Sequence, residues 1–464
     1  MHSSESKTYQ RKRSLFWSLP LFAVFLLIGF MSCNQQLATT SNGGKVYNVE
    51  DFGAVGDSVT VNTEAIQTAI SQAYQDSGGT VLIPEGVFSS GSIYLKENVY
   101  LKVAEGGTLR GVAGNENYPT LENTRIAGLT VDWPSALVNA INTRNVKISG
   151  KGTIDGSGYY WWEDYWEKRD SLSGTIHPDL IDWHVPRPRL VLFDSVSVSS
   201  IEDINLKNSG FWTVHILYSN RIDITGVNIE NPAIETDVQA ASTDGIDIDS
   251  SRDIYIRNCS ISVDDDCIAL KSGRYSDGLK IGIPTKNVVI ENCTFLKGHG
   301  GVSIGTETAG GIKNVMVRNN RASGNQAPIK FKARPGRGGV IENITHVGWD
   351  IKNAGTVIHY SLREVTGEDY VDPWTDEMIP FEEATPRYRN ITIRDVEAVG
   401  AEESISFLGW PLAHAQNVIL EDISIQAETG AQFQYIDNLL LDNVEIEVPG
   451  NPMEFTEVPH KIRK

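Results

Sequence analysis

Four aspartates lie close together in the chain and could carry acid–base chemistry. Asp264, Asp265 and Asp266 follow one another 20 to 22 residues after Asp244, in the segment STDGIDIDSSRDIYIRNCSISVDDDCIALKSG. Apolar residues follow the triplet at once, so the repulsion among its carboxylates costs folding free energy and suggests a function. A solvated acidic turn and a calcium-binding loop are the alternative interpretations.

A repeat surrounds these aspartates and indicates how they are positioned. From residue 145 the chain repeats a polar turn residue, β-branched residues alternating with polar ones, and then Asn or Asp, as in NVKISG, RDIYIRNCSI, KNVVIENCTF and QNVILEDISI. The interval is mostly 21–34 residues, which is typical of a solenoid with one coil per repeat. We predict an all-β, single-stranded right-handed parallel β-helix; a jelly roll and a β-propeller, which needs near-constant blades, are the alternatives.

The residues before the repeat predict a helix that caps the N-terminal end of the solenoid. Asn62 or Thr63 can cap this helix, and its apolar face contains Ala65, Ile66, Ala69, Ile70 and Ala73. Two insertions interrupt the coils, an aromatic-rich one at residues 156–188 and an acidic one at 363–387. We expect these loops to shape a cleft, with simple decoration as the alternative.

Apolar pairs in four consecutive coils predict the register. They are Ile246/Ile248, Ile268/Leu270, Val302/Ile304 and Ile329/Phe331. If each pair points inward, the strands stack about 4.8 Å apart. In that register Asp244 lies beside Asp266, and His299 lies beside Asp265. A histidine between glycines, as His299 is, could also be a satisfied turn residue.

Three lysines are predicted to join this patch. Lys330 and Lys332 face outward one coil further on, and Lys271 lies in the same column as Lys332. Three carboxylates can divide glycoside hydrolysis between one protonated acid and one or two bases that activate water. The lysines would bind a carboxylate on the sugar and would weaken a calcium site, so we expect no metal and no cofactor.

The four segments that carry these residues resemble glycoside hydrolase family 28, the polygalacturonase family. STDGIDIDSS, DDDCIALKSG, GHGG and KFKARPGRGG follow the order of the family's NTD, GDD or QDD, GHG and RIK motifs. The opening YNVEDFGAVGD…NTEAIQTAI is also similar to that of these pectin-degrading β-helix enzymes, and the resemblance covers nearly all of residues 45–445. It implies inverting hydrolysis of α-galacturonide linkages.

The resemblance also implies a role for each matching residue. Asp265 would be the general acid, Asp244 and Asp266 would activate water, His299 would orient or tune the acid, and Lys332 would bind the galacturonate carboxylate. In an inverting enzyme the acid and base carboxylates are expected about 6.5–9.5 Å apart.

Three positions depart from the motifs. Ser242 replaces Asn, which should be tolerated because both residues form turns. Asp264 replaces Gly or Gln, and we expect its side chain to point away and be solvated. Lys330 replaces Arg and loses the fork that grips a carboxylate, so the sugar on the leaving-group side is either galacturonate or rhamnose.

We therefore predict a polygalacturonase-like hydrolase that acts on a pectic polysaccharide or oligosaccharide near chain ends. The chain-end preference rests on residues 156–188, whose aromatic side chains could wall off the cleft and stack on sugar. The alternatives are a rhamnogalacturonan hydrolase of the same family, a calcium-dependent pectate lyase and a non-catalytic carbohydrate-binding solenoid.

The N-terminus is typical of an exported protein. A basic segment from Lys7 to Arg13 precedes an apolar stretch, and Met31-Ser32-Cys33 resembles a bacterial lipoprotein cleavage site. We predict an export signal at 1–32, lipidation of Cys33, a linker at 33–44 and the hydrolase domain at 45–464. A simple secretory signal or an uncleaved membrane segment is the alternative. The expected location is the periplasm or outer membrane of a Gram-negative bacterium, or the medium.

Charge and cysteine content narrow the classes of partner. The net charge of −19 over 464 residues repels nucleic acid and acidic membrane surfaces. We therefore expect no nucleic-acid partner, and contact with a membrane only through a lipid on Cys33. Cys259 and Cys293 take the same place in two repeats and should be stacked, buried, inert thiols. We expect a monomer.

Overall fold

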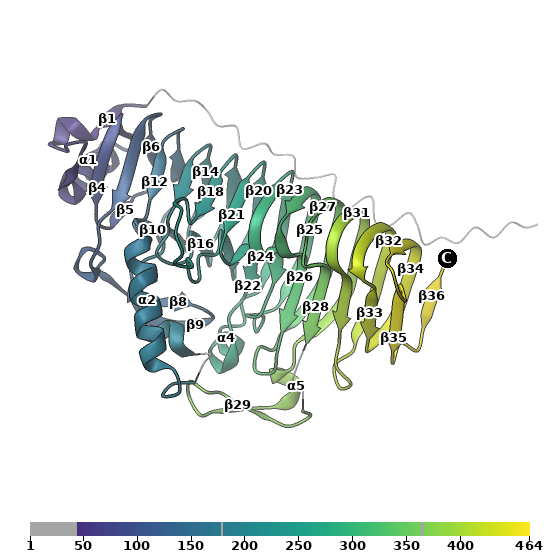
Figure 1. Cartoon of the computed structure of the whole chain (residues 1–464). Coiled ribbons are helices and arrows are strands. Elements are labelled where there is room, and N and C mark those ends of the chain that lie inside the picture. The colour runs from purple at the N-terminus through teal and green to yellow at the C-terminus, as the bar shows by residue number, and fades with distance from the viewer. Residues whose placement is uncertain (1–43, 178–179, 363–365) are drawn as a thin grey trace, which may run out of the picture. The chain divides into compact units, whose positions relative to one another are not determined.

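Parallel strands stacked in successive coils make up most of the described chain (Figure 1). The structure, a computed structural model, describes residues 44–177, 180–362 and 366–464. Each strand pairs with the equivalent strands of the coils before and after it, as β16 (Val214–Leu217) does with β13 (Val191–Asp194) and β19 (Ile246–Asp249). The predicted parallel β-helix is confirmed.

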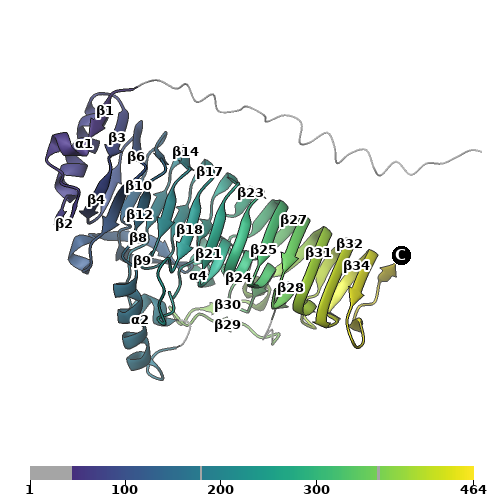
Figure 2. The same ribbon diagram turned by 45° about the horizontal axis from the view of Figure 1, so that its top comes forward.

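The strands form three faces, each a ladder that follows the order of the coils (Figures 1 and 2). Face 1 consists of β5 (Ile93–Leu95), β10 (Val138–Ile141), β13, β16, β19, β22 (Asp266–Lys271), β24 (Thr294–Ile304), β26 (Asn325–Ala333), β28 (Thr356–Leu362), the end of β31 (Arg387–Leu408), β33 (Ala431–Gln434) and β35 (Met453–Thr456). Face 2 consists of β1 (Val46–Asn48), β3 (Gly79–Ile83), β6 (Val99–Val103), β11 (Lys147–Ser149), β14 (Ser197–Glu202), β17 (Asn220–Thr225), β20 (Arg252–Arg257), β23 (Thr285–Glu291), the first parts of β25 (Ile312–Ser323), β27 (Val340–Lys352), β31, β32 (Ala415–Thr429) and β34 (Ile436–Glu447), and β36 (Lys461–Arg463).

Face 3 connects the other two. It begins with β2 (Asp57–Val61), β4 (Gly86–Ser90), β7 (Gly107–Gly111), β12 (Thr153–Asp155), β15 (Asn205–Lys207), β18 (Asn228–Asn231) and β21 (Ser260–Val263). From β24 onward it continues through long strands that bend from one face to the next.

Helix α1 (Thr63–Gln75) covers the N-terminal end of the solenoid, as predicted (Figure 1). Its Ile66, Ala69, Ile70 and Ala73 are fully buried, and the helix contacts β1, β3 and β5. Asn62 precedes the helix but does not cap it, which corrects one of the two capping predictions. The Asn62 amide instead bonds to both backbone groups of Val55 and so fixes the preceding loop.

The predicted insertions lie beside face 1 with two further elements (Figures 1 and 2). Residues 156–188 contain two helices that were not predicted from the sequence, α2 (Tyr159–Leu172) and α3 (Ile181–His184). Residues 363–387 contain the hairpin of β29 (Tyr370–Val371) and β30 (Met378–Ile379) and helix α5 (Phe381–Ala384). The other two are the hairpin of β8 (Thr120–Ile126) and β9 (Leu129–Pro134) and helix α4 (Tyr275–Ile281).

A ladder of asparagines explains the polar turn residue of the repeat. Each of its members has a left-handed φ between 56° and 64° and donates a side-chain hydrogen bond of 2.8–3.2 Å to the equivalent residue of the preceding coil. They are Asn287, Asn314, Asn343, Asn390, Asn417 and Asn438. Asn tolerates this conformation better than other non-glycine residues, so one residue type both makes the turn and joins the coils.

Apolar side chains fill the interior along the whole stack. Cys259 and Cys293 are buried free thiols at equivalent positions of successive coils, which confirms that they are buried and stacked. Cys33 and the predicted export signal lie outside the described residues. Within the described ranges, no helix is long and apolar enough to cross a membrane.

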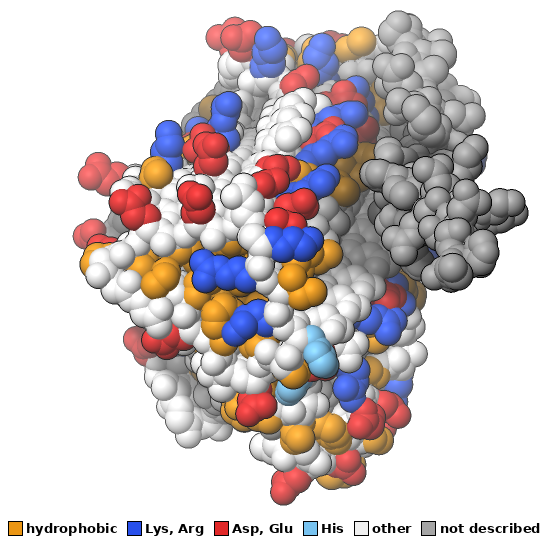
Figure 3. All heavy atoms as spheres, turned by 90° about the vertical axis from the view of Figure 1, so that its right-hand side faces the viewer, with side chains coloured by type: hydrophobic (Ala, Val, Ile, Leu, Met, Phe, Trp, Pro, Cys, Tyr) orange, Lys and Arg blue, Asp and Glu red, His pale blue; other side chains and the backbone are white. Residues whose placement is uncertain are grey.

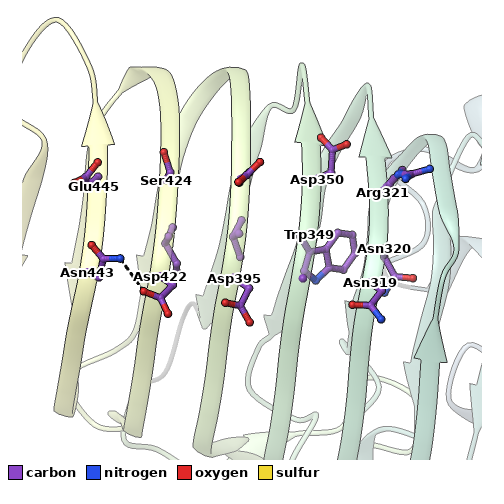
Figure 4. A pocket seen from close by; sticks show the side chains of 14 residues that line it. Asn319, Asn320, Arg321, Trp349, Asp350, Asp395, Asp422, Ser424, Asn443 and Glu445 are labelled. Carbon is purple, nitrogen blue, oxygen red and sulfur yellow. Dashed lines mark hydrogen bonds between the residues drawn. The ribbon is translucent and has the colours of Figure 1, made fainter.

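Charged side chains also stack in columns on the outside. A shallow groove on face 3 is lined by acidic columns that include Asp350, Glu397 and Glu445 (Figure 4). Seen from the C-terminal end, acidic and basic side chains are interspersed, with hydrophobic side chains between them (Figure 3). The groove would repel an anionic polymer, and the predicted site lies on face 1 instead.

His346 is a fully buried histidine inside the solenoid. Its ring stacks on that of Trp349 at 6.0 Å and meets Phe331 edge-on at 5.7 Å. Neither ring nitrogen has a hydrogen-bond partner among the described residues. Burial lowers the pKa of His346 to about 3, so the folded protein keeps this histidine neutral.

Stability should therefore fall as the pH falls below about 6.5. The unfolded chain protonates His346 near that pH but the folded chain does so only near pH 3, and the difference is worth up to about 1.4 kcal/mol for each pH unit between the two values. His346→Phe should flatten this part of the stability curve, measured by urea unfolding from pH 7 to pH 4. The control is His460→Phe at an exposed position; an unchanged slope in His346→Phe would contradict the prediction.

Candidate active site

The four inward pairs stack in the predicted register. Ile246, Ile268, Val302 and Ile329 are paired in one column, and Ile248, Leu270, Ile304 and Phe331 in the next. All eight side chains are fully buried. The residues between and before them must therefore face outward or lie in the turns that lead into face 1.

Three aspartates meet where successive coils enter face 1. Gly245 N donates to Asp266 O (2.9 Å) and His299 N donates to Asp265 O (2.8 Å), so the three turns are tied by their backbones. Carboxylate oxygens of Asp244, Asp265 and Asp266 lie within 4.8 Å of one another. The structure thus brings together the residues that the register predicted.

Asp265 and His299 form the solvent-accessible part of this group. The Nδ1 atom of His299 lies 3.2 Å from Asp265 Oδ1, and the two side chains are 35% and 28% exposed. The hydrogen bond to Asp265 raises the pKa of His299. Burial raises the pKa of Asp265, but the His299 hydrogen bond and the nearby Lys332 outweigh it and keep that pKa below its ordinary value. In the free protein the proton of this pair therefore lies on His299.

Two lysines hold the buried Asp266 carboxylate, one at each oxygen. Lys332 Nζ lies 2.6 Å from Asp266 Oδ2, and Lys330 Nζ lies 3.2 Å from Oδ1 and from the carbonyl oxygen of His299. Burial opposes ionisation of Asp266, but the two ammonium groups outweigh it and hold its pKa far below the usual range. Lys332 is 29% exposed and Lys330 14%.

Asp244 differs from its two neighbours in its protonation. It is buried, and burial raises the pKa of Asp244 to about 7 although Lys271, 3.1 Å away, opposes the shift. Lys271 was predicted to bind substrate, and the structure corrects this: it is 5% exposed. Its ammonium is enclosed by carboxyl groups and by the Trp212 ring, whose centre is 3.6 Å away.

Asp264 points away from the other three aspartates but is not solvated as predicted. Its side chain is 9% exposed and pairs with Lys297 at 2.5 Å. Its second oxygen accepts a hydrogen bond from Ala240 N (2.9 Å). Asp264 therefore ties two turns together beside the site and leaves the carboxylate trio to Asp244, Asp265 and Asp266.

The spacing of the trio corrects a further expectation. The oxygens are closer than the 6.5–9.5 Å expected between acid and base in an inverting enzyme. Oxygens within 4.8 Å of one another still let one water bond to two of the carboxylates, since each O–H···O bond spans about 2.7–2.8 Å. The same oxygens could bind a cation, but Asp266 already pairs with two ammonium groups, which disfavours a calcium site.

Arg187 connects the 156–188 insertion to the turn before Asp244 and was missed by sequence reasoning. Its buried guanidinium donates to Ala241 O (2.8 Å) and to Asp182 Oδ1 (3.0 Å). Ser242, which has a left-handed φ of 54°, also donates to Asp182 Oδ1 (3.3 Å). The insertion thus holds the turn that carries Asp244, and no periodic pattern in the sequence could have indicated this contact.

Most aromatic residues of the insertion pack internally, so few of those predicted to stack on sugar are available to do so. Trp161, Trp162 and Tyr165 are buried. The ring of Tyr165 lies flat against Arg187, with its centre 3.9 Å from the guanidinium carbon. Only Tyr159 and Tyr160 of α2's aromatic residues are markedly exposed, at 39% and 48%.

The insertions meet over one part of face 1 and close it. An apolar cluster joins hairpin β8–β9, Trp183, Trp212, Tyr275 and Ile379. Arg125 of the hairpin pairs with Asp249 of β19 at 3.0 Å. As a result the outward-facing Leu192, His215 and Asp249 of β13, β16 and β19 are fully buried, whereas Asp265, His299 and Lys332 stay open to solvent.

The model of the glycosyl hydrolases family 28 matches residues 81–441. The chain belongs to this family. It is 29% identical over 392 residues to a probable polygalacturonase of Vitis vinifera, covering 82% of this chain and 74% of the relative. It is 26% identical over 457 residues to an exo-poly-α-D-galacturonosidase of Dickeya chrysanthemi, covering 89% and 73%. The chain is therefore a glycosidase.

Solved structures of this family have the same fold. An exopolygalacturonase of Thermotoga maritima aligns with a TM-score of 0.71 at 26% identity, covering 89% of this chain and 92% of that one. A family 28 exopolygalacturonase of Yersinia enterocolitica aligns with a TM-score of 0.76 at 21% identity, covering 91% and 78%.

Arg187→Met should lower kcat about 10- to 100-fold with little change in KM, because the turn before Asp244 loses its side-chain bonds. Small displacements of a catalytic group, which the sequence predicts Asp244 to be, cost this much. Steady-state kinetics on pectic oligosaccharides measure the effect. Arg257→Met is the control, since Arg257 makes similar bonds to Asp223 between face 2 strands. Equal activity of the two variants would contradict the role of Arg187.

Lys271→Met should move the acidic limb of the kcat/KM profile to higher pH by about one unit or more. If Asp244 is a base, as predicted from the sequence, it must be ionised, so activity rises as the pH rises through the pKa of Asp244, about 7. Loss of the ammonium raises that pKa further. Lys297→Met, which breaks the ion pair to Asp264, is the control and should keep the wild-type limb. If the acidic limb of Lys271→Met stays at the wild-type pH, Asp244 is not the group that sets this limb.

Proposed function

We propose that the protein is an inverting hydrolase that cleaves α-galacturonide linkages of pectin from chain ends. The observation that carries the proposal is the meeting of Asp244, Asp265 and Asp266 within 4.8 Å beside two lysines. Family membership supports glycoside hydrolysis, and the names of the relatives support a galacturonide substrate.

Asp265 is the proposed general acid, because it is the most solvent-accessible carboxyl group of the trio and pairs with His299. A bound sugar would exclude water from this pair and disfavour its separated charges. The proton of His299 then moves to Asp265, which gives it to the glycosidic oxygen as the bond to the anomeric carbon breaks. His299 thus supplies and orients the acid.

Asp244 is the proposed base. Its pKa of about 7 makes it a better proton acceptor than Asp266, whose pKa is held far lower by two ammonium groups. A water between the two carboxylates would give its proton to Asp244 while its oxygen attacks the anomeric carbon. Asp266 orients this water, and attack opposite to the leaving group inverts the configuration.

Lys332 is the proposed site for the substrate carboxylate. It is the more exposed of the two lysines and keeps donors free beyond its bond to Asp266. Lys330 is the second proposed ligand, although two of its donors already bind Asp266 and the His299 carbonyl. These cations are the local attraction that an anionic polymer needs on a protein with a net charge of −19.

Cleavage from chain ends is supported by the closure of face 1 on one side of the site. Leu192 of β13 and the outward residues of β16 and β19 are buried under the insertions, so a polymer could extend only toward β26 and beyond. The exo-acting relatives of Dickeya chrysanthemi and Thermotoga maritima agree with this assignment.

A rhamnogalacturonan hydrolase is the second candidate. The observation that favours it is Lys330, which lacks the fork of an arginine and is engaged with Asp266. Activity on rhamnogalacturonan oligosaccharides with none on polygalacturonate would select this candidate. The export signal, lipidation of Cys33 and the monomeric state remain predictions, which mass spectrometry of the mature protein and light scattering can test.

Digestion of polygalacturonate should release one short saturated product from the start, with little early loss of viscosity. Product sizing distinguishes this from the broad ladder of an enzyme that cuts internally, and proton NMR of the first product should show the β-anomer. An unsaturated product absorbing in the ultraviolet, or loss of activity with a chelator, would support a lyase and overturn the proposal.

Two adjacent aspartates provide a matched control. Asp265→Asn should lower kcat about 100- to 10,000-fold, because it removes the acid. Asp264→Asn should stay within about threefold of wild type, because Asp264 lies outside the trio and the amide oxygen of asparagine can still accept the bond from Ala240 N. Full activity of Asp265→Asn would show that the acid is misassigned.

A further inference from the structure

One ammonium group lies among three buried carboxyl groups beside the proposed base. Lys271 Nζ lies 2.7 Å from Asp247 Oδ1, 3.1 Å from Asp244 Oδ2 and 3.7 Å from Glu307 Oε1. None of the three carboxyl side chains is more than 9% exposed. Three ionised carboxylates would leave two negative charges without compensation away from water, which is strongly unfavourable. At least one of the three must be neutral.

Asp247 is the most enclosed of the three. It is fully buried on the outward side of β19, in register with His215 of β16 and Ala269 of β22. No backbone or uncharged side-chain group of the described residues donates to either oxygen. Among the described residues, Lys271 is the only cation within ion-pair distance of Asp247, and Asp244 and Glu307 share its ammonium.

The other groups that face Asp247 do not compensate its charge. Burial lowers the pKa of His215 to about 4, so this neighbour is neutral. Arg189 acts on Asp247 only through space, and its Nη1 contacts His215 Nδ1 at 2.9 Å. Burial raises the pKa of Asp247 well above its ordinary value; Lys271 opposes this, and the charge of Asp244 adds to it.

We propose that Asp247 is a neutral carboxylic acid that donates a hydrogen bond to the Asp244 carboxylate and positions it. The proposal rests on the assignment of Asp244 as the base. Two donors, the Asp247 hydroxyl and the Lys271 ammonium, would then fix the orientation of Asp244, and its remaining lone pairs would face the water. Asp247 does not touch the substrate and is a positioning residue.

The isosteric variant Asp247→Asn tests this assignment. Its amide is neutral and can donate the same hydrogen bond, so kcat/KM should stay within about threefold of wild type and the acidic limb within about 0.3 pH unit. Asp247→Leu keeps the volume but has no donor. Its kcat should fall about tenfold or more, and its acidic limb should move to higher pH, because a lost hydrogen bond disfavours the ionised base.

Other outcomes would overturn the proposal. If Asp247 is ionised, Asp247→Asn removes a negative charge beside Asp244 and the acidic limb moves to lower pH by about one unit. A variant Asp247→Asn that does not fold would also count against a neutral Asp247, because the amide matches the neutral acid in size and donor capacity. If Asp244→Asn keeps full activity, the base itself is misassigned, which separates failure of the proposed function from failure of this inference.

Infrared difference spectroscopy of the full protein gives a readout that does not depend on activity. At pH 8 the wild type should retain the carbonyl band of a protonated carboxylic acid, and Asp247→Asn should lose it. Asp223→Asn, which changes an aspartate in an ion pair with Arg257, should leave the band unchanged. A wild type without the band would show that Asp247 is ionised.

Discussion

The rise from one coil to the next sets every distance in the candidate site. Inward pairs such as Ile246/Ile268 and Ile248/Leu270 lock neighbouring strands in one register, and a shift of one residue would turn each apolar side chain outward. The same register carries Asp244 to Asp266 and His299 to Asp265. Hydrophobic burial thus does more than stabilise the solenoid: it brings polar groups from four coils within reach of one another.

Compensation of charge then decides what each carboxylate can do. Asp266 has a cation at each oxygen, Asp265 pairs with His299, and Asp244 shares one buried ammonium with two other carboxyl groups. Chemically identical side chains therefore differ widely in proton affinity within a few ångströms. The insertions contribute to this difference, because Trp212 and the hairpin β8–β9 exclude water from the side of Asp244 and leave the side of Asp265 open.

The fold and the main site residues could be predicted because both follow a periodic pattern. The alternation of apolar and polar residues within each coil indicates the strands, and Asn or Asp marks the turns. Aligning the inward apolar pairs of successive coils then brings the three aspartates together. Long side chains were harder to place. Lys271 occupies the predicted column, but its reach back to Asp247 and its cover by Trp212 depend on residues from other coils. Asp247 itself was overlooked, although its outward position between Ile246 and Ile248 could have been derived from the same register.

The insertions could be located but not interpreted from sequence. Helix α2 has no clear apolar stripe, so periodicity did not indicate it, and its tryptophans looked available for sugar although most are buried. Arg187 gave no local signal, because its partners Ala241 and Asp182 lie in different segments. The Asp264 side chain was predicted to be solvated because its partners, Lys297 and Ala240, come close to it only when the coils stack.

The asparagine ladder has a consequence for how such a protein can change in length. Each rung donates to the rung before it and accepts from the rung after it, so a complete coil can be duplicated or lost together with its own turn and its own bond. Outside the segment from β19 to β26, such a change would alter the number of coils and leave the carboxylates untouched. A coil added between β19 and β22 would move Asp244 away from Asp265 and Asp266 by about one more strand spacing, and a coil added between β22 and β26 would separate the aspartates from His299 or from the two lysines. Length variation in relatives that keep this chemistry should therefore be confined to the ends of the solenoid and to the loops.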